Sequence, residues 1–113
     1  MTIINSSSKN MTPSLKYLLT KNPSIITVKN LEDGAKITVA EWCIYKDTNA
    51  NGDEVELLSF IDKNNQGYAT QSETFKKSFN DILEIMDGNT GFTIVKMSGT
   101  TKKGRSFVNC GLC

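Results

Sequence analysis

The sequence predicts a mainly β protein built as a small five-stranded barrel, with one helix inside the run of strands and a shorter helix ahead of it. Three observations lead to this prediction. Apolar and β-branched residues form five short runs, turn residues separate these runs, and one strongly amphipathic helical pattern falls between the third run and the fourth. At 113 residues the chain is long enough for a single core and too short for two.

The N-terminal segment precedes the barrel in this prediction. Residues 1–11 are polar and rich in Ser and Asn, so we expect a disordered N-terminal arm, with residues 12–113 forming a single domain. Thr12 is a helix-capping residue and Pro13 favours the first helical position. Together they predict a short helix that ends before Pro23.

The first barrel strand is expected at residues 35–45, after a shorter β-branched run at residues 24–29. Its apolar residues have one parity up to Val39 and the opposite parity from Trp42 onward. This change of phase near Glu41 predicts a bulge or a strong bend, which lets one strand serve both sides of a small barrel.

The remaining elements are four strands and one helix. The strand candidates are separated by turn residues and cover residues 55–61, 67–69, 92–98 and 106–112. Residues 70–73 form a capping box, and Gly88 ends the helix that follows. The apolar residues at helical spacing are Phe75, Phe79, Ile82, Leu83 and Met86. Three strands, a helix and two strands is the chain order of the OB-fold, so we expect an OB-like Greek-key barrel with the helix between strands three and four.

The composition removes most catalytic chemistries. The chain contains no histidine, which excludes Ser-His-Asp and Cys-His nucleophilic systems and histidine-bearing zinc sites. There is no Walker loop and no G-x-G-x-x-G motif, and the carboxylates are scattered mostly through turns and an exposed helix face. We therefore expect a protein that is not an enzyme and needs no cofactor.

Two short motifs resemble metal sites, but their spacing argues against both. Residues 47–52 match the first half of an EF-hand loop, yet the twelfth position is Leu58, where a bidentate Glu is required. Cys110 and Cys113 have C-x-x-C spacing, but no second pair exists and Cys43 would add only a third ligand. We expect a polar hairpin turn at the first motif, a small core residue at Cys110, and no metal.

The compartment can be inferred from what the sequence lacks. No run approaches the roughly twenty apolar residues of a membrane span, and the first residues lack the apolar stretch of a signal peptide. Three cysteines are an odd number that fits a reducing environment better than a disulfide framework. The expectation is a cytoplasmic protein without a membrane partner.

The loop between the last two strands gives the clearest functional signal. Lys102, Lys103 and Arg105 place three cations in four residues, and Phe107 follows them closely. Mobile cationic groups pair with phosphates and an aromatic ring offers a face to a base, so the loop suits single-stranded nucleic acid better than a small substrate. The formal net charge is only +1, so electrostatic binding must come from a local patch.

Further candidates come from the expected fold. In an OB-fold, the middle strands and the loops between strands one and two and between strands four and five form the binding face. The aromatic and cationic residues expected there, together with the basic loop, are Trp42, Tyr45, Lys46, Phe60, Tyr68, Lys96, Lys102, Lys103, Arg105 and Phe107. Tyr68 and Phe107 lie outside the expected core positions of their strands, which is where stacking rings are needed.

Each of these assignments has a structural alternative. A lone Trp in a small β domain is often a core residue because its large apolar surface is readily buried, so Trp42 and also Phe60 remain open as core or surface residues. The basic loop has its own alternative, a solvated hairpin tip in which Lys and Gly are common.

Two segments carry a resemblance to a known family. Residues 67–79 (GYATQSETFKKSF) and 99–112 (GTTKKGRSFVNCGL) resemble small single-stranded DNA-binding proteins of phages and mobile elements of low-GC Gram-positive bacteria. The resemblance implies an OB-type replication or recombination factor that coats exposed strands. The matching binding residues would be Tyr68, Lys102, Lys103, Arg105 and Phe107. Many bacterial relatives end in a long acidic tail that recruits partners, whereas this chain stops at Cys113, so recruitment by a tail is not expected.

These observations predict a sequence-tolerant single-stranded DNA-binding protein that acts in phage or mobile-element replication or recombination. One subunit has a small patch, so useful affinity would require neighbours on the strand or a homo-oligomer, with replication or recombination proteins as further partners. The alternative is a non-enzymatic protein-interaction module of a phage or mobile element that binds a host protein through a sheet edge, which the near-zero net charge favours.

Overall fold

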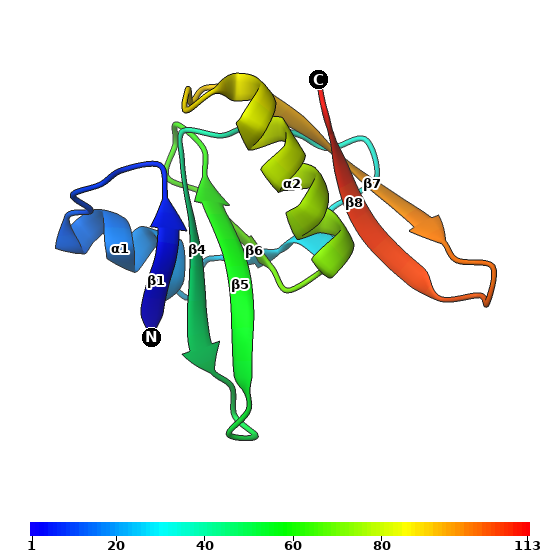
Figure 1. Cartoon of the computed structure of the whole chain (residues 1–113), viewed down its shortest axis with the longest axis horizontal. Coiled ribbons are helices and arrows are strands. Elements are labelled where there is room, and N and C mark those ends of the chain that lie inside the picture. Colours follow the sequence, from blue (N-terminus) through cyan, green and yellow to red (C-terminus); the bar gives the residue numbers. More distant parts are fainter.

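The chain folds into two β-sheets and two α-helices, with one short 3-10 turn (Figure 1). The structure is a computed structural model and describes all of residues 1–113. In chain order the elements are β1 (Thr2–Ser6), α1 (Pro13–Thr20), β2 (Ile26–Thr27), the 3-10 turn (Val28–Asn30), β3 (Lys36–Thr38), β4 (Glu41–Thr48), β5 (Glu54–Ile61), β6 (Gly67–Thr70), α2 (Glu73–Met86), β7 (Thr93–Thr100) and β8 (Ser106–Leu112). Strands predominate, which confirms the predicted mainly β class.

The two sheets pack around α2. One sheet has five strands in the order β1-β4-β5-β6-β2, and the other has three in the order β3-β7-β8. Neighbouring strands are antiparallel except for β2 and β6, which are parallel. α2 lies between the five-stranded sheet and the β7–β8 hairpin, and α1 lies on the other side of the five-stranded sheet (Figure 1). Hydrophobic side chains therefore cover both faces of that sheet.

A bent segment joins the two sheets, as the change of phase near Glu41 predicts. β3 pairs with β7 in the smaller sheet, and β4 pairs with β5 in the larger one. The transfer takes place between two adjacent residues. The N–H of Val39 donates to the carbonyl of Phe92 at 2.8 Å, and the N–H of Ala40 donates to the carbonyl of Ile61 at 2.9 Å. One continuous stretch of chain thus holds both sheets in place.

The sheets do not close into a barrel, which differs from the expected five-stranded closure. Closure would require β6 to pair with β8, but the free edge of β6 is taken by β2, whose Ile26 lies opposite Tyr68. α2 begins directly after β6 and packs against β8 instead. The two regions are linked there by a side chain, because the Ser72 hydroxyl donates to the Val108 carbonyl at 3.3 Å.

The first residues form a strand where a disordered arm was expected. β1 pairs antiparallel with β4, with Ile3 opposite Tyr45, and the register shifts between Ile3 and Asn5. The N–H of Ser7 extends this pairing by donating to the carbonyl of Trp42 at 3.0 Å. A polar sequence is compatible with an edge strand because the backbone makes the hydrogen bonds and the side chains can remain in water.

α1 begins at the predicted cap, Thr12, whereas α2 is capped by Ser72 and not by Thr70, the first residue of the predicted capping box. The Thr12 hydroxyl accepts a hydrogen bond from the N–H of Leu15, and the Ser72 hydroxyl accepts one from the N–H of Phe75, each at 3.2 Å. α2 ends on Asp87, which adopts the left-handed conformation with φ of 52° immediately before Gly88. Neither helix combines the length and the apolar character needed to cross a bilayer.

The larger of the two core clusters contains a group of stacked aromatic rings centred on Phe60. This ring is fully buried on β5 and lies 5.5 Å from the ring of Tyr68, 6.1 Å from that of Phe75 and 5.6 Å from that of Phe79. The helical spacing of Phe75 and Phe79 directs both rings at the sheet. Such contacts add to the hydrophobic stabilisation of burying each ring.

The three cysteines should differ sharply in reactivity. Burial raises the pKa of Cys43 and raises the pKa of Cys110 to about 12, whereas Cys113 is exposed. Because the thiolate is the reactive form, we expect Ellman's reagent at pH 8 to modify one thiol rapidly in the native protein and three after denaturation. Rapid modification of a second native thiol would contradict the packing of Cys43 and Cys110.

Candidate nucleic-acid interface

The β7–β8 hairpin extends beyond the rest of the molecule and carries the basic loop at its tip (Figure 1). Three hydrogen bonds fix the loop backbone. The N–H of Thr101 donates to the Arg105 carbonyl at 2.8 Å, that of Gly104 to the Thr101 carbonyl at 2.9 Å, and that of Arg105 to the Thr101 hydroxyl at 3.1 Å. Gly104 has φ of 83°, a conformation that glycine adopts without strain. The loop therefore presents its cations from a defined turn.

The strand alternation gives the three-stranded sheet one covered face and one open face. Ile94 and Cys110 point toward α2 and belong to the core cluster. The odd-numbered residues of β7 and β8 alternate with these core residues and point the other way. Among them, Val95, Met97 and Phe107 belong to neither core cluster. We call this open surface the outer face, and its residues are Lys36, Val95, Met97, Gly99, Phe107 and Asn109. It is adjacent to the basic loop.

Phe107 is positioned on the outer face by the glycine opposite it. Gly99 and Phe107 are cross-strand partners. A methyl group added at Gly99 would lie 2.5 Å from Cζ of Phe107, so the ring lies directly over the glycine backbone. This packing holds one face of a half-buried ring against the sheet and leaves the ring beside the loop.

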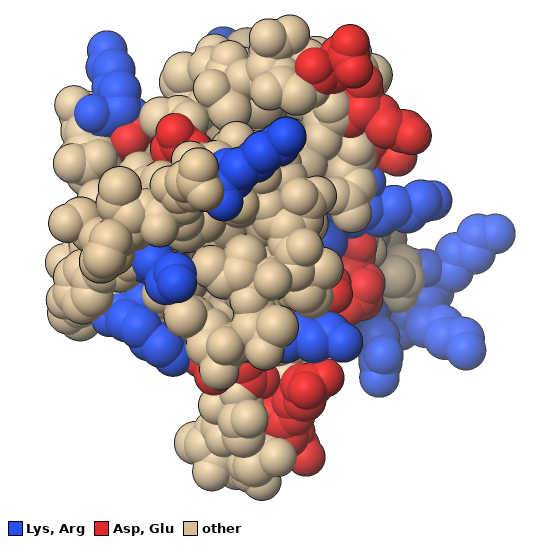
Figure 2. Space-filling view, turned by 60° about the vertical axis from the view of Figure 1, so that its left-hand side comes forward, with Lys and Arg blue, Asp and Glu red and all other residues tan.

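The cations next to the outer face are free of acidic partners. Lys36, Lys102, Lys103 and Arg105 take part in no ion pair, whereas the ion-paired lysines elsewhere include Lys46, which lies 3.5 Å from Glu54. Cationic side chains gather on the side of the molecule where the β7–β8 hairpin lies, while acidic ones form separate groups on the β4–β5 hairpin at the bottom and at the upper right of the view (Figure 2). A local positive patch therefore exists despite the net charge of +1.

Three of the predicted aromatic residues lie in the interior. Trp42 is 8% exposed, Tyr45 4% and Phe60 0%, so none offers a ring face for stacking on a base. Phe60 and Trp42 pack beneath α2, and Tyr45 packs beneath α1, where burial raises the pKa of its hydroxyl to about 12. α2 covers one face of the five-stranded sheet and α1 covers the other. Because alternate residues of a strand point to opposite faces, both sets of alternate side chains in this sheet are buried.

Lys96 is also a structural residue. Its side chain is buried, and Nζ donates to the Leu31 carbonyl and to Asp33 Oδ1, each at 2.8 Å. Asp33 Oδ2 also accepts from the Ser98 hydroxyl at 2.6 Å. Hydrogen bonds from Lys96 and Ser98 lower the pKa of Asp33. The network ties the 31–34 loop to β7, so Lys96 anchors the hairpin.

The Asp33 network predicts a pH-dependent contribution to stability. Because its folded-state pKa lies below the ordinary value near 3.8, the stabilisation is present above that value and is lost as the pH falls through the lowered pKa. We expect Asp33→Asn to be less stable than wild type in urea unfolding at pH 7, since it leaves the Lys96 ammonium buried without its carboxylate. The difference should shrink toward pH 2, and a constant difference would contradict the network.

Two other predicted residues lie outside the outer face. Tyr68 is half-buried on β6, where its ring stacks on Phe60 and burial raises the pKa of its hydroxyl. Lys46 is exposed on β4 and forms an ion pair with Glu54 on β5, so it lies on the β4–β5 hairpin and not on the β7–β8 hairpin. The structure therefore brings together Phe107 and the three cations of the basic loop and separates them from five of the other six predicted residues. The sixth, Lys96, lines a hollow of about 470 Å³ together with Phe107.

Several residues of the outer face are absent from the sequence-based site. Met97 is 40% exposed and Asn109 lies opposite it across the hairpin, while Lys36 on β3 lies opposite Val95. The alternation of residues 93–99 contains a signal for this face, because Val95 and Met97 have the parity opposite to Ile94. Lys36 could not be placed without knowing that β3 pairs with β7.

No protein-family model, curated protein or solved structure matches this chain. The functional proposal therefore rests on the residues and on the geometry described above.

Proposed function

We propose that the protein binds single-stranded DNA, with little dependence on sequence, through the outer face and the basic loop. One observation carries the proposal: Phe107 lies on an open sheet face immediately beside three cations that have no acidic partner. A positive path for the phosphate backbone combined with a ring for the bases is the general arrangement of single-strand binding surfaces. The phage or mobile-element setting rests on the resemblance alone.

The cations are spaced for an extended strand. Lys36 lies opposite Val95, and β7 continues for five more residues to Thr100, so the basic loop begins roughly 17 Å from Lys36 at the rise of a β-strand. A path of this length spans several nucleotides. With four cations engaged, the plot of log Kobs against log salt concentration should have a slope of about −3, at about −0.7 for each neutralised phosphate.

The bases would contact the apolar strip between these cations. Phe107 would stack on one base, while the exposed side chain of Met97 and that of Val95 provide apolar contacts that do not discriminate among bases. A single ring limits the affinity of one subunit, so tight coating of a strand would require several subunits bound side by side.

The topology is compatible with this proposal. The bent segment that pairs in both sheets, and α2 between the third and fourth barrel strands, support an OB-like arrangement that is open between β6 and β8. In OB-folds the hairpin between strands four and five contributes to the binding face, and β7 and β8 would be those strands.

Two substitutions on the outer face should weaken DNA binding without unfolding the domain. Phe107→Ala removes the stacking ring, which contributes about 1 to 3 kcal/mol, so we expect oligo-dT affinity to fall by about 5- to 150-fold. Gly99→Ala removes no binding group but displaces the ring. It should weaken binding in the same direction, and wild-type affinity in both variants would contradict a role for Phe107.

A direct test is fluorescence anisotropy with labelled oligo-dT at about 50 mM and about 200 mM salt. We expect binding at the lower salt concentration and about 50-fold weaker binding at the higher one, which follows from a slope near −3. Absence of binding at the lower concentration would refute the proposal. Because Trp42 is buried, its fluorescence is expected to change little when DNA binds.

The same face provides a specific argument for the rival function. Val95 and Met97 are apolar residues on an open sheet face, which is a surface that a protein partner could cover. A protein-interaction module would not lose affinity for oligo-dT with salt, because it would not bind oligo-dT at all. The anisotropy titration therefore decides between the two functions.

A further inference from the structure

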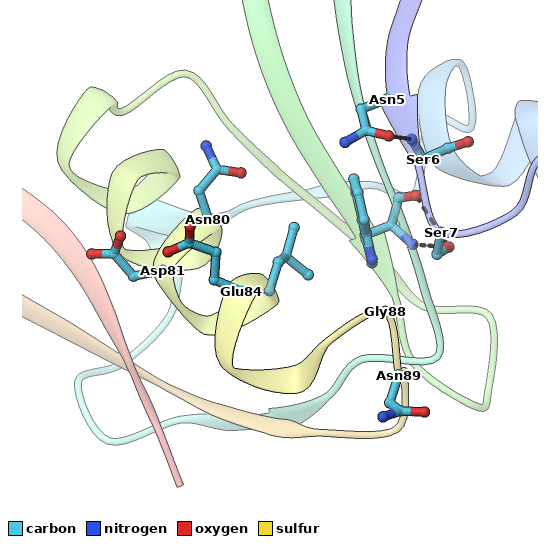
Figure 3. Close-up of a pocket in the computed structure, with 10 residues that line it drawn as sticks. Asn5, Ser6, Ser7, Asn80, Asp81, Glu84, Gly88 and Asn89 are labelled. Carbon is cyan, nitrogen blue, oxygen red and sulfur yellow. Dashed lines mark hydrogen bonds between the residues drawn. The ribbon is translucent and has the colours of Figure 1, made fainter.

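A separate pocket lies between α2 and the edge of the five-stranded sheet. Its volume is about 550 Å³, within the range of small-molecule sites. Asn80, Asp81 and Glu84 border it on α2, with Asp81 on the side of the helix away from β1, and Asn5 and Ser7 border it at the end of β1 (Figure 3). Only two of its ten lining residues, Trp42 and Leu83, are hydrophobic. The pocket therefore suits a polar ligand.

Trp42, which lines this pocket, carries an unused hydrogen-bond donor. The residue is 92% buried, and all of its hydrogen bonds are made by its backbone. The indole Nε1–H donates to no protein group, yet no fully buried side-chain nitrogen or oxygen lacks a partner. Nε1 must therefore reach solvent, and Trp42 lines the pocket. A donor held rigidly in this way favours a ligand that carries an acceptor.

The two carboxylates define the charge of the ligand. Asp81 and Glu84 are three residues apart, so they lie on one side of α2, and no cation pairs with either. They lie in the C-terminal half of the helix, where the helix dipole disfavours negative charge, so they do not stabilise the helix. No Lys or Arg lines the pocket. Phosphates and other anions would be repelled.

The amide side chains extend the range of possible hydrogen bonds. Asn80 lies beside the carboxylates, and Asn89 uses Nδ2 to bond the Met86 carbonyl, which leaves its Oδ1 available. The Asn5 Oδ1 accepts from the backbone of Ser6, which leaves its Nδ2 available. The pocket thus offers donors and acceptors side by side, in addition to the indole N–H.

We propose that this pocket binds an uncharged, hydroxyl-rich ring, of which a sugar is the simplest example. A hydroxyl group both donates and accepts, so one ligand can donate to Glu84, beside which Asp81 lies, and accept from the Trp42 indole (Figure 3). The hydrogen bond to the carboxylate is charge-assisted and supplies most of the affinity. The site is distinct from the outer face, and the proposal does not depend on DNA binding.

The single tryptophan makes a direct test possible, because the protein has one indole Nε1–H resonance. We would titrate the ¹⁵N-labelled protein with glucose, galactose, N-acetylglucosamine and maltose at millimolar concentrations, and with glucose 6-phosphate and oligo-dT for comparison. At least one neutral sugar should shift the indole resonance in a saturable manner, and glucose 6-phosphate should bind more weakly than glucose. If no neutral sugar shifts this resonance, the proposal is wrong, whatever oligo-dT does.

A pair of variants locates the binding. The double variant Asp81→Asn and Glu84→Gln should weaken the sugar that binds wild type by more than tenfold, since the charge-assisted acceptor and the charge beside it are both lost. The control, Asp53→Asn with Glu54→Gln on the β4–β5 hairpin, changes the charge equally and should leave the affinity unchanged. Circular dichroism verifies the fold of both. Equal affinity in the two double variants would overturn the assignment.

Discussion

Replacing Lys102, Lys103 and Arg105 with Gln is expected to weaken oligo-dT binding about 100-fold at 0.1 M salt. The estimate follows from the loss of three phosphate contacts, each of which contributes about 0.7 to the salt slope for a single strand. The slope itself should fall from about −3 to about −0.7, which leaves the contribution of Lys36. Anisotropy titrations at several salt concentrations measure both quantities. All three side chains are exposed, so the fold should be unaffected.

A charge-matched control separates this local effect from a general one. Lys9, Lys16 and Lys63 are also exposed and form no ion pair, but they lie near the N-terminus, on α1 and in the β5–β6 turn. Their triple substitution by Gln removes the same charge and should leave both affinity and salt slope close to wild type. An equal loss in the two triple variants would show that the basic loop has no special role.

Phe60→Ala is expected to lower the free energy of unfolding by about 3 to 5 kcal/mol. The ring is fully buried and contacts the rings of Tyr68, Phe75 and Phe79, so its removal leaves a cavity among rigid aromatic groups. A domain of this size has a total stability of about 5 to 15 kcal/mol, so the variant should be marginally folded or unfolded. Urea denaturation followed by circular dichroism measures the change.

Phe60→Leu serves as the conservative comparison, because it keeps an apolar side chain at the site and should be clearly more stable than the alanine variant. Its folded form should bind oligo-dT as wild type does, since Phe60 has no exposed surface. Phe107→Ala should behave in the opposite way, with little loss of stability and a clear loss of binding. A stable Phe60→Ala variant that fails to bind DNA would place the binding surface on the five-stranded sheet.

The elements that depend on local sequence were largely predictable. The cap of α1 at Thr12, the apolar face of α2 and the bend before Glu41 follow from spacing and side-chain chemistry alone, whereas the cap of α2 is Ser72, two residues after the predicted Thr70. The open barrel and the strand β1 were not predictable, because they depend on competition between distant segments. The two-residue strand β2 occupies the edge of β6 that barrel closure needs, and no property of Ile26 or Thr27 alone indicates this.

The predicted binding residues also differ in whether the sequence alone could place them. Phe107 could be placed on the open face from the alternation of β8, because Val108 and Cys110 point into the core and Phe107 has the opposite parity. Trp42 and Lys96 could not be placed in this way, because their burial results from α2 and from the 31–34 loop packing against strands that are distant in sequence. The sequence specifies which side chains share a face of a strand, while tertiary packing decides which faces are covered.

The most direct test of the central claim is to map oligo-dT on the protein by ¹H–¹⁵N correlation spectroscopy at low salt. We predict that the largest chemical-shift changes fall on the amides of residues 95–109 and of Lys36. The β4–β5 hairpin and the indole of Trp42 should be nearly unchanged. Changes concentrated on the five-stranded sheet, with residues 99–107 unaffected, would contradict the account.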